Sequence, residues 1–84
     1  MDEIKQDIRQ FVAELVPNGT SAKVTDATPL RTSGMIDSMG LLRLVGMVED
    51  KFGIEVSAYE AGVENFDRID DIAALVERKR MAQA

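Results

Sequence analysis

The sequence predicts an all-α protein, a small four-helix bundle with three main helices, a short third helix and a long first loop. Apolar residues recur at helical spacing in three separate stretches, and residues typical of helix starts and stops flank these stretches. The chain is 84 residues long, which is enough for a single modest core. We therefore expect residues 1–84 to form one domain.

Apolar residues near the N-terminus recur at the spacing of one helical face: Ile4, Ile8, Phe11, Val12 and Leu15. A first helix is therefore predicted, ended by Pro17-Asn18-Gly19. From this stop to Asp37 no period is sustained, which leaves a connection of about twenty residues. A loop of that length must be pinned to the core of a compact domain, and we expect Val24, Leu30 and Ile36 to pin it.

The second helix is predicted from about Ser38 to Phe52, ended by Gly53. Its core stripe comprises Leu41, Leu44, Val45, Val48 and Phe52. Just before it, Gly34 permits an unusual turn, and Asp37 and Ser38 are residue types that bind the unpaired N–H groups of a first helical turn. This junction is interpreted either as a helix cap alone or as a functional site.

The opposite side of the second helix combines apolar side chains that are not branched at Cβ and a glycine with only a few charges: Met39, Leu42, Arg43, Gly46, Met47 and Asp50. A merely solvated face would be charged throughout, whereas this composition suits adaptable contacts with other proteins. We call these six residues the predicted docking surface. In the alternative interpretation, Leu42 and Met47 belong to the edge of the core.

Beyond this helix, Ser57 is predicted to cap a short third helix that ends at Gly62. The last helix is predicted to begin at a capping arrangement of Asp67 and Asp70 and to end near Arg80, after which the chain is expected to fray. Its apolar stripe comprises Ile69, Ile72, Ala73 and Val76.

Composition excludes several functions. The chain contains neither cysteine nor histidine, so it lacks thiolate metal ligands, the usual nitrogen ligand of zinc and the usual general base for a serine nucleophile. Acidic residues around Asp67 and Asp71 lack the spacing of a calcium loop, and no metal site or catalytic residue is predicted. A net charge of −5 disfavours nucleic acid and anionic lipid as partners. With no apolar run near the ~18 residues of a membrane span and no basic leader, a soluble cytoplasmic protein is expected.

The segment Ser33-Gly34-Met35-Ile36-Asp37-Ser38-Met39, followed by an apolar helix and then Phe52-Gly53-Ile54-Glu55-Val56, resembles the phosphopantetheine-bearing acyl and peptidyl carrier proteins. The signature of that family is Asp-Ser-Leu at the start of the second helix, usually with a glycine shortly before it. The similarity covers nearly the whole chain in length, helix order, long first loop and acidic balance. It implies that residues 1–84 form a single carrier-protein domain.

By this resemblance, Ser38 accepts 4′-phosphopantetheine from coenzyme A through a separate magnesium-dependent transferase, and the thiol of the arm carries an acyl or aminoacyl group as a thioester. Asp37 would help the transferase to recognise the site. The implied partners are a phosphopantetheinyl transferase, an acyl- or aminoacyl-loading enzyme and downstream synthase or transferase enzymes. The chain itself would be a monomer and would catalyse no reaction.

Three residues depart from the family pattern. Met39 replaces the usual leucine, and Gly40 and Arg43 stand on a face where carriers of fatty-acid synthesis are usually strongly acidic. The segment from Glu64 to Asp70 is similar to stand-alone carriers of aminoacyl, peptidyl or unusual polyketide extender units. The resemblance thus favours a polyketide or non-ribosomal peptide pathway over fatty-acid synthesis. An unmodified helical interaction module remains the alternative of another class.

Overall fold

The computed structural model describes residues 2–16 and 24–83, and within these ranges it contains four helices and no strand. Their bounds are Asp2–Leu15 for α1, Ser38–Phe52 for α2, Val63–Phe66 for α3 and Ile69–Gln83 for α4. The predicted all-α class is confirmed, with three substantial helices and one short one. None of the described helices is long and apolar enough to span a bilayer. The predicted stop at Pro17-Asn18-Gly19 lies outside the described residues.

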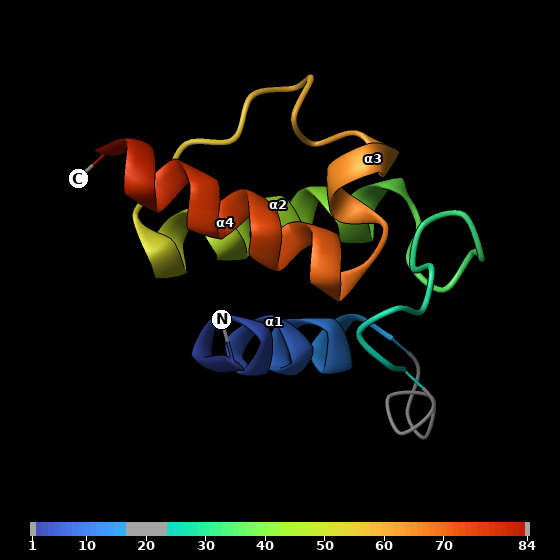
Figure 1. The fold of residues 1–84 in the computed structure, drawn as a ribbon. Coiled ribbons are helices and arrows are strands. Elements are labelled where there is room, and N and C mark those ends of the chain that lie inside the picture. The colour runs from blue at the N-terminus through green and yellow to red at the C-terminus, as the bar shows by residue number, and fades with distance from the viewer. Residues whose placement is uncertain (1, 17–23, 84) are drawn as a thin grey trace.

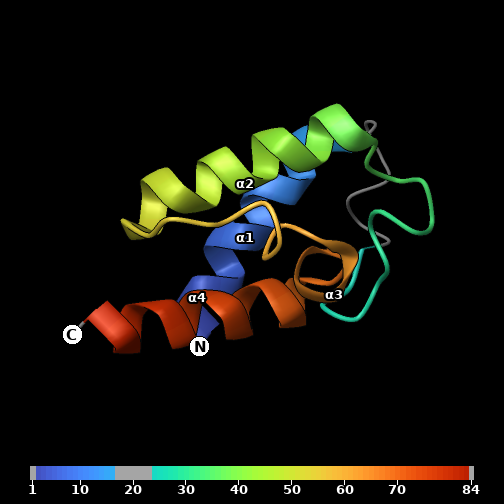
Figure 2. The ribbon, with the colours of Figure 1, turned by 90° about the horizontal axis from the view of Figure 1, so that it is seen from above.

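Helix α1 packs against both α2 and α4, and the short α3 packs against α4 (Figure 1). Helices α2 and α4 run in the same general direction, and α1 lies beneath them and crosses from α4 to α2 (Figures 1 and 2). The largest fully buried side chains come from all four helices and from the first loop: Ile8, Val12, Leu30, Leu44, Val48, Phe66, Ile69, Ile72 and Val76. One core therefore joins every element of the bundle.

The first loop is pinned to this core as the sequence predicts. Leu30 is fully buried, Ile36 is 2% exposed, and Val24 packs against the core from a partly buried position. The backbone is tied as well, because the Leu30 N–H donates to the Asp67 carbonyl at 2.7 Å and the Ile36 N–H donates to the Leu30 carbonyl at 3.0 Å. The described part of the loop lies at the end of the bundle where α3 and the start of α4 are found (Figure 2).

A second tie holds the loop near Asp26. The Asp26 carboxylate accepts hydrogen bonds from Arg9 Nε at 2.8 Å and from Arg9 Nη2 at 2.6 Å, and the Asp26 carbonyl accepts from the Asp70 N–H at 3.0 Å. The hydrogen bond from Arg9 holds the pKa of Asp26 below its ordinary value, against the opposing effect of burial. The loop is thus connected to α1 and to α4 at the same residue.

Helix α2 occupies the predicted range and has the predicted caps. Asp37 is its N-cap, with a side chain that accepts from the Gly40 N–H at 2.8 Å. Gly53 follows the last helical residue with φ at 65°, in the left-handed region, and its N–H donates to the Glu49 carbonyl. Leu44, Val45 and Val48 are buried as predicted, and Leu41 and Phe52 pack against the core from partly buried positions.

The predicted position of the third helix is wrong. Ser57 and Glu60 do form a capping box, in which the Ser57 hydroxyl accepts from the Glu60 N–H at 3.1 Å and the Glu60 carboxylate accepts from the Ser57 N–H at 3.0 Å. This box closes one turn, with the Ala61 N–H bonded to the Ser57 carbonyl, but the turn does not continue as a helix. The short helix begins after Gly62 instead and is anchored by Phe66, which is 1% exposed.

The predicted ends of α4 are also wrong, although its apolar stripe is confirmed. The helix begins at Ile69, because the Asp67 side chain binds the first loop rather than the N–H groups of α4. It continues to Gln83 rather than ending near Arg80. Ile69, Ile72, Ala73 and Val76 are buried, as is Leu75.

Two glycines of α2 differ in their surroundings. A Cβ atom at Gly40 would lie 2.7 Å from Ile36 Cγ2 and 3.3 Å from Asp37 Oδ1, whereas a Cβ atom at Gly46 would meet nothing within 4 Å. Ile36 is buried and branched at Cβ, so its Cγ2 cannot move aside without disturbing the core. Gly40 is therefore required by the approach of the loop to the first turn of α2.

We expect Gly40→Ala to destabilise the protein and Gly46→Ala to stabilise it. Alanine at position 46 gains about 0.5–1 kcal/mol from helix propensity, whereas at position 40 the same gain is outweighed by an overpacking cost of typically ~1–3 kcal/mol. Urea unfolding of the two variants measures both effects. Equal stabilisation by the two substitutions would contradict the packing described for Gly40.

Candidate functional site

Ser38 is the first residue of α2, and its side chain is exposed. Asp37 immediately before it has an extended backbone, with φ at −84° and ψ at −176°, and caps the helix. The first N–H groups of a helix lack partners within the helix, and together with the helix dipole they favour an anion at this end. The hydroxyl of Ser38 is thus presented to solvent at a point where added negative charge is stabilised.

Arg31 lies next to this hydroxyl. Its guanidinium Nη2 donates to Ser38 Oγ at 3.0 Å. Arg31 was not predicted as a site residue, because the six positions between it and Ser38 lie in a stretch without helical or strand periodicity. Only the path of the loop through Leu30 and Ile36 brings them together.

The path of the first loop is held by Asp67, which is only 8% exposed. Its Oδ1 accepts from the Arg31 N–H at 2.8 Å and from the Thr32 N–H at 3.0 Å, and its Oδ2 accepts from the Thr32 hydroxyl at 2.7 Å. Burial alone would raise the pKa of Asp67, but these hydrogen bonds from Thr32 and Arg31 outweigh it and hold the pKa below its ordinary value. A charged carboxylate between α3 and α4 therefore fixes the backbone on which the Arg31 side chain is mounted.

The predicted docking surface lies on the outer side of α2. Met39 is 74% and Leu42 is 68% exposed, and Arg43 and Asp50 are exposed as well. Gly46 and Met47 are partly buried. The edge-of-core interpretation is therefore wrong for Leu42 and fits only Met47.

A depression of about 490 Å³ lies beside the start of α2. It is lined by Glu14 and Leu15 at the end of α1 and by Asp37, Met39, Gly40 and Arg43. It is open to solvent, polar and apolar groups share its lining, and it borders both the Ser38 junction and the predicted docking surface. A partner that reached Ser38 from this side would contact α1 and α2 together.

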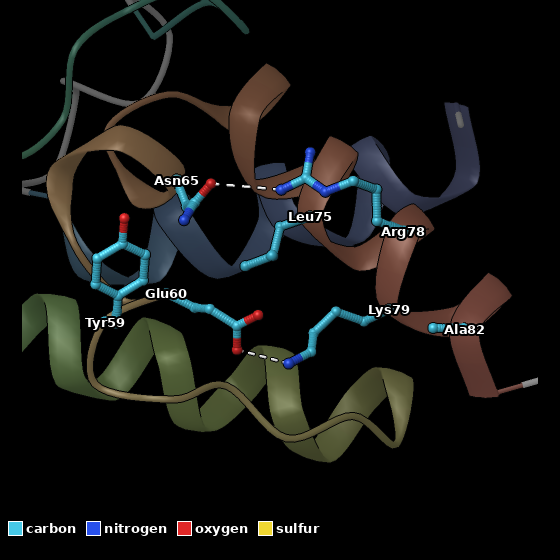
Figure 3. A pocket seen from close by; sticks show the side chains of 7 residues that line it. All are labelled: Tyr59, Glu60, Asn65, Leu75, Arg78, Lys79 and Ala82. Carbon is cyan, nitrogen blue, oxygen red and sulfur yellow. Dashed lines mark hydrogen bonds and ion pairs between the residues drawn. The ribbon is translucent and has the colours of Figure 1, made fainter.

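A second depression, of about 430 Å³, lies between the Ser57–Gly62 turn and α4 (Figure 3). Glu60 and Lys79 form an ion pair of 2.6 Å within it, and Leu75 contributes an apolar wall. The hydrogen bond from Lys79, together with that from the Ser57 N–H, lowers the pKa of Glu60 to about 2. The pair ties the turn to α4, and none of the residues around Ser38 lines this pocket.

Within residues 2–16 and 24–83, no three carboxylate, histidine or cysteine side chains are grouped closely enough to hold a metal ion. At the start of α2, the side chains beside the Ser38 hydroxyl are a carboxylate engaged with the Gly40 N–H and a guanidinium that donates to Oγ. An arginine is not a base at physiological pH. Among the described residues, neither side chain beside the Ser38 hydroxyl is placed to take its proton.

Fold and site together describe a helical protein with an exposed serine hydroxyl at the capped start of α2. Residues 6–77 match the model of a family described as phosphopantetheine attachment site. Because this match covers most of the chain, the protein belongs to that family of carrier proteins. A comparison with curated proteins gives no match.

Membership establishes a covalent 4′-phosphopantetheine as the prosthetic group. It also establishes that the protein is a non-catalytic carrier, modified by a phosphopantetheinyl transferase and served by partner enzymes. The predicted role as a carrier with a phosphopantetheine arm is therefore confirmed. The attachment residue and the docking residues remain predictions from the sequence, now with defined positions in the fold.

We expect Asp67→Asn to destabilise the protein by about 1–3 kcal/mol at pH 7, because it removes charge-assisted hydrogen bonds from a buried group. The folded-state pKa of Asp67 is lowered, so the contribution of its charge is complete above the unfolded value of about 3.9 and is lost as the pH falls through the lower folded-state value. The difference in the free energy of unfolding between wild type and Asp67→Asn should therefore become smaller below about pH 4.

Urea unfolding at a series of pH values measures this difference. The control is Asp7→Asn, which removes the same charge from α1 and is expected to change stability by less than about 0.5 kcal/mol. If the difference in the free energy of unfolding between wild type and Asp67→Asn stayed constant down to pH 2, the role given to the charge of Asp67 would be contradicted.

Proposed function

We propose that the protein holds biosynthetic intermediates as thioesters on a 4′-phosphopantetheine arm attached to Ser38. The observation that carries the proposal is the exposed Ser38 hydroxyl at the capped start of α2. A phosphodiester fits the groups present, because it would stand at a helix N-terminus beside the Arg31 guanidinium. The arm supplies the thiol that the cysteine-free polypeptide lacks.

Attachment requires little of this chain. Ser38 Oγ forms the new bond to phosphorus, the bond from that phosphorus to the adenosine-bearing half of coenzyme A breaks, and the hydroxyl proton passes to the transferase. The protein contains no histidine to accept that proton. The contribution of Asp37 is positional, because its bond to the Gly40 N–H fixes the backbone immediately before Ser38. Because Asp37 fixes the position of Ser38 in this way, we also assign it a part in recognition by the transferase.

Incubation with coenzyme A, magnesium and a promiscuous phosphopantetheinyl transferase is expected to raise the intact mass by one arm. Ser38→Ala should gain no mass, while Ser33→Ala, which removes the nearby hydroxyl of the same loop, should gain it fully. Because Ser38 is exposed, its replacement should change stability by no more than about 0.5 kcal/mol. An unmodified wild type, or equal modification of Ser38→Ala, would exclude this attachment site.

The predicted docking surface further supports a carrier of acyl or aminoacyl units in a polyketide or non-ribosomal peptide type of pathway, rather than in fatty-acid synthesis. Its exposed apolar residues, Met39 and Leu42, are accompanied by one cation and one anion, Arg43 and Asp50. Position 40 has no room for an acidic side chain, since even a Cβ atom would collide with Ile36. Such a surface suits partners that are less basic than those expected for fatty-acid carriers.

The contacts of a carrier with successive enzymes must be weak enough to exchange. Unbranched, adaptable side chains such as Met39 and Met47 provide apolar area without a rigid shape, which permits several partners to be bound in turn. The area available along one face of a 15-residue helix is that of a transient interface rather than of a permanent one. The partners proposed are the transferase, an acyl- or aminoacyl-loading enzyme and a downstream synthase.

We expect Arg43→Glu to lower kcat/KM for loading by the cognate enzyme about two- to fivefold, the range of one exposed charge pair. The control is Arg80→Glu, which makes the same change of charge in the last turn of α4 and should leave loading unchanged. The measurement is the rate of thioester formation on the modified protein at two salt concentrations. Equal rates for wild type and Arg43→Glu would remove Arg43 from the docking surface.

A further inference from the structure

We propose that Arg31 binds the phosphate of the arm and holds it against the start of α2. Arg31 is thus a positioning residue for the prosthetic group. This inference rests on the proposed attachment at Ser38 and adds to it a second protein group with a defined role. Three observations carry it: the contact between the two side chains, the fixed backbone of Arg31, and the charge around the site.

The contact is direct. Arg31 Nη2 donates to Ser38 Oγ at 3.0 Å in the unmodified protein. On attachment, Oγ becomes a bridging ester oxygen, and the charged oxygens are bonded to the phosphorus that it carries. A guanidinium presents five N–H donors in a planar fork, so it can turn from Oγ to these oxygens without moving its backbone. A bond from the guanidinium to a charged phosphate oxygen adds the attraction of opposite charges, which a neutral hydroxyl does not offer.

The backbone that carries Arg31 is fixed on both sides. Its N–H donates to Asp67 Oδ1 at 2.8 Å, and its carbonyl accepts from the Gly34 N–H at 3.2 Å in the turn that leads toward Ser38. Leu30 before it is fully buried, and its N–H is bonded to the Asp67 carbonyl at 2.7 Å. The side chain therefore starts from a position set by the core, and less conformational entropy is lost when it binds the phosphate.

The charge of the site favours the same arrangement. The protein carries a net charge of −5, and attachment places a further negative charge one residue after the exposed Asp37 carboxylate. Two anions so close repel each other, and the dipole of α2 offsets only part of this. The Arg31 guanidinium, which already contacts Ser38 Oγ, supplies further positive charge to offset this repulsion. The base of the arm is then held in place, while the thiol end stays free to reach partner enzymes.

The test compares the unmodified and modified forms of wild type, Arg31→Gln and the control Arg80→Gln, which removes the same charge near the opposite end of the bundle. Intact mass is measured first and shows whether each protein has gained the arm. Urea unfolding then gives the effect of modification on each variant. For each protein, the effect of modification is the ratio of the folding equilibrium constants of the modified and unmodified forms. We expect this ratio to be about two- to fivefold larger for wild type and for Arg80→Gln than for Arg31→Gln.

A second readout observes the phosphate itself. The ³¹P resonance of the modified wild type should differ from that of modified Arg31→Gln and should move toward it as salt is raised, because the pair is exposed to screening. Equal effects of modification on all three proteins, with identical ³¹P resonances, would overturn the role of Arg31. Absence of any mass gain in wild type would instead overturn attachment at Ser38, so the two failures are distinguishable.

Discussion

The structure around the proposed attachment site depends on one buried carboxylate. Asp67 lies between α3 and α4 and accepts three hydrogen bonds from Arg31 and Thr32, while its own carbonyl accepts from Leu30. A long loop without secondary structure is normally a poor platform for chemistry, because its backbone is free to move. Here the carboxylate replaces the partners that a strand or helix would have provided. The loop thereby becomes a fixed connection between the core and the start of α2.

The same constraint explains the first turn of α2. Ile36 must enter the core directly before the helix begins, and its bond to the Leu30 carbonyl leaves it little freedom. The first turn then passes so close to Ile36 that only glycine fits at position 40. Asp37 caps the helix from the residue between them. The cap at Asp37, the buried Ile36 and Gly40 act together: the Ser38 hydroxyl points outward, while Leu41, Leu44 and Val45 turn toward the core.

Local patterns predicted much of this arrangement. The range of α2 and both of its caps could be derived because N-caps, left-handed glycines and apolar stripes act over four or five residues. The roles of Asp67 and Arg31 could not be derived from local patterns. Asp67 binds residues far away in the sequence, and Arg31 contacts Ser38 across an irregular turn. Asp67 has the residue type and spacing of a helix cap, yet the unpaired N–H groups of the loop bind it instead. The Ser57–Glu60 box likewise formed as a local pattern predicts, and the turn that it closes ends at Gly62 as predicted. Nothing local indicates that this segment stays a single turn and that the short helix follows Gly62.

A carrier must also protect its cargo from its own side chains. A thioester on the arm is attacked most readily by thiolates and is hydrolysed with help from imidazole bases, and this sequence contains neither cysteine nor histidine. The cation nearest to the proposed attachment point is an arginine, which stays protonated and is no nucleophile at physiological pH. A lysine at position 31 would offer similar charge to the phosphate but would bring a potential amine nucleophile to the base of the arm. The choice of guanidinium over ammonium therefore suits a site that must bind an anion and leave a thioester intact.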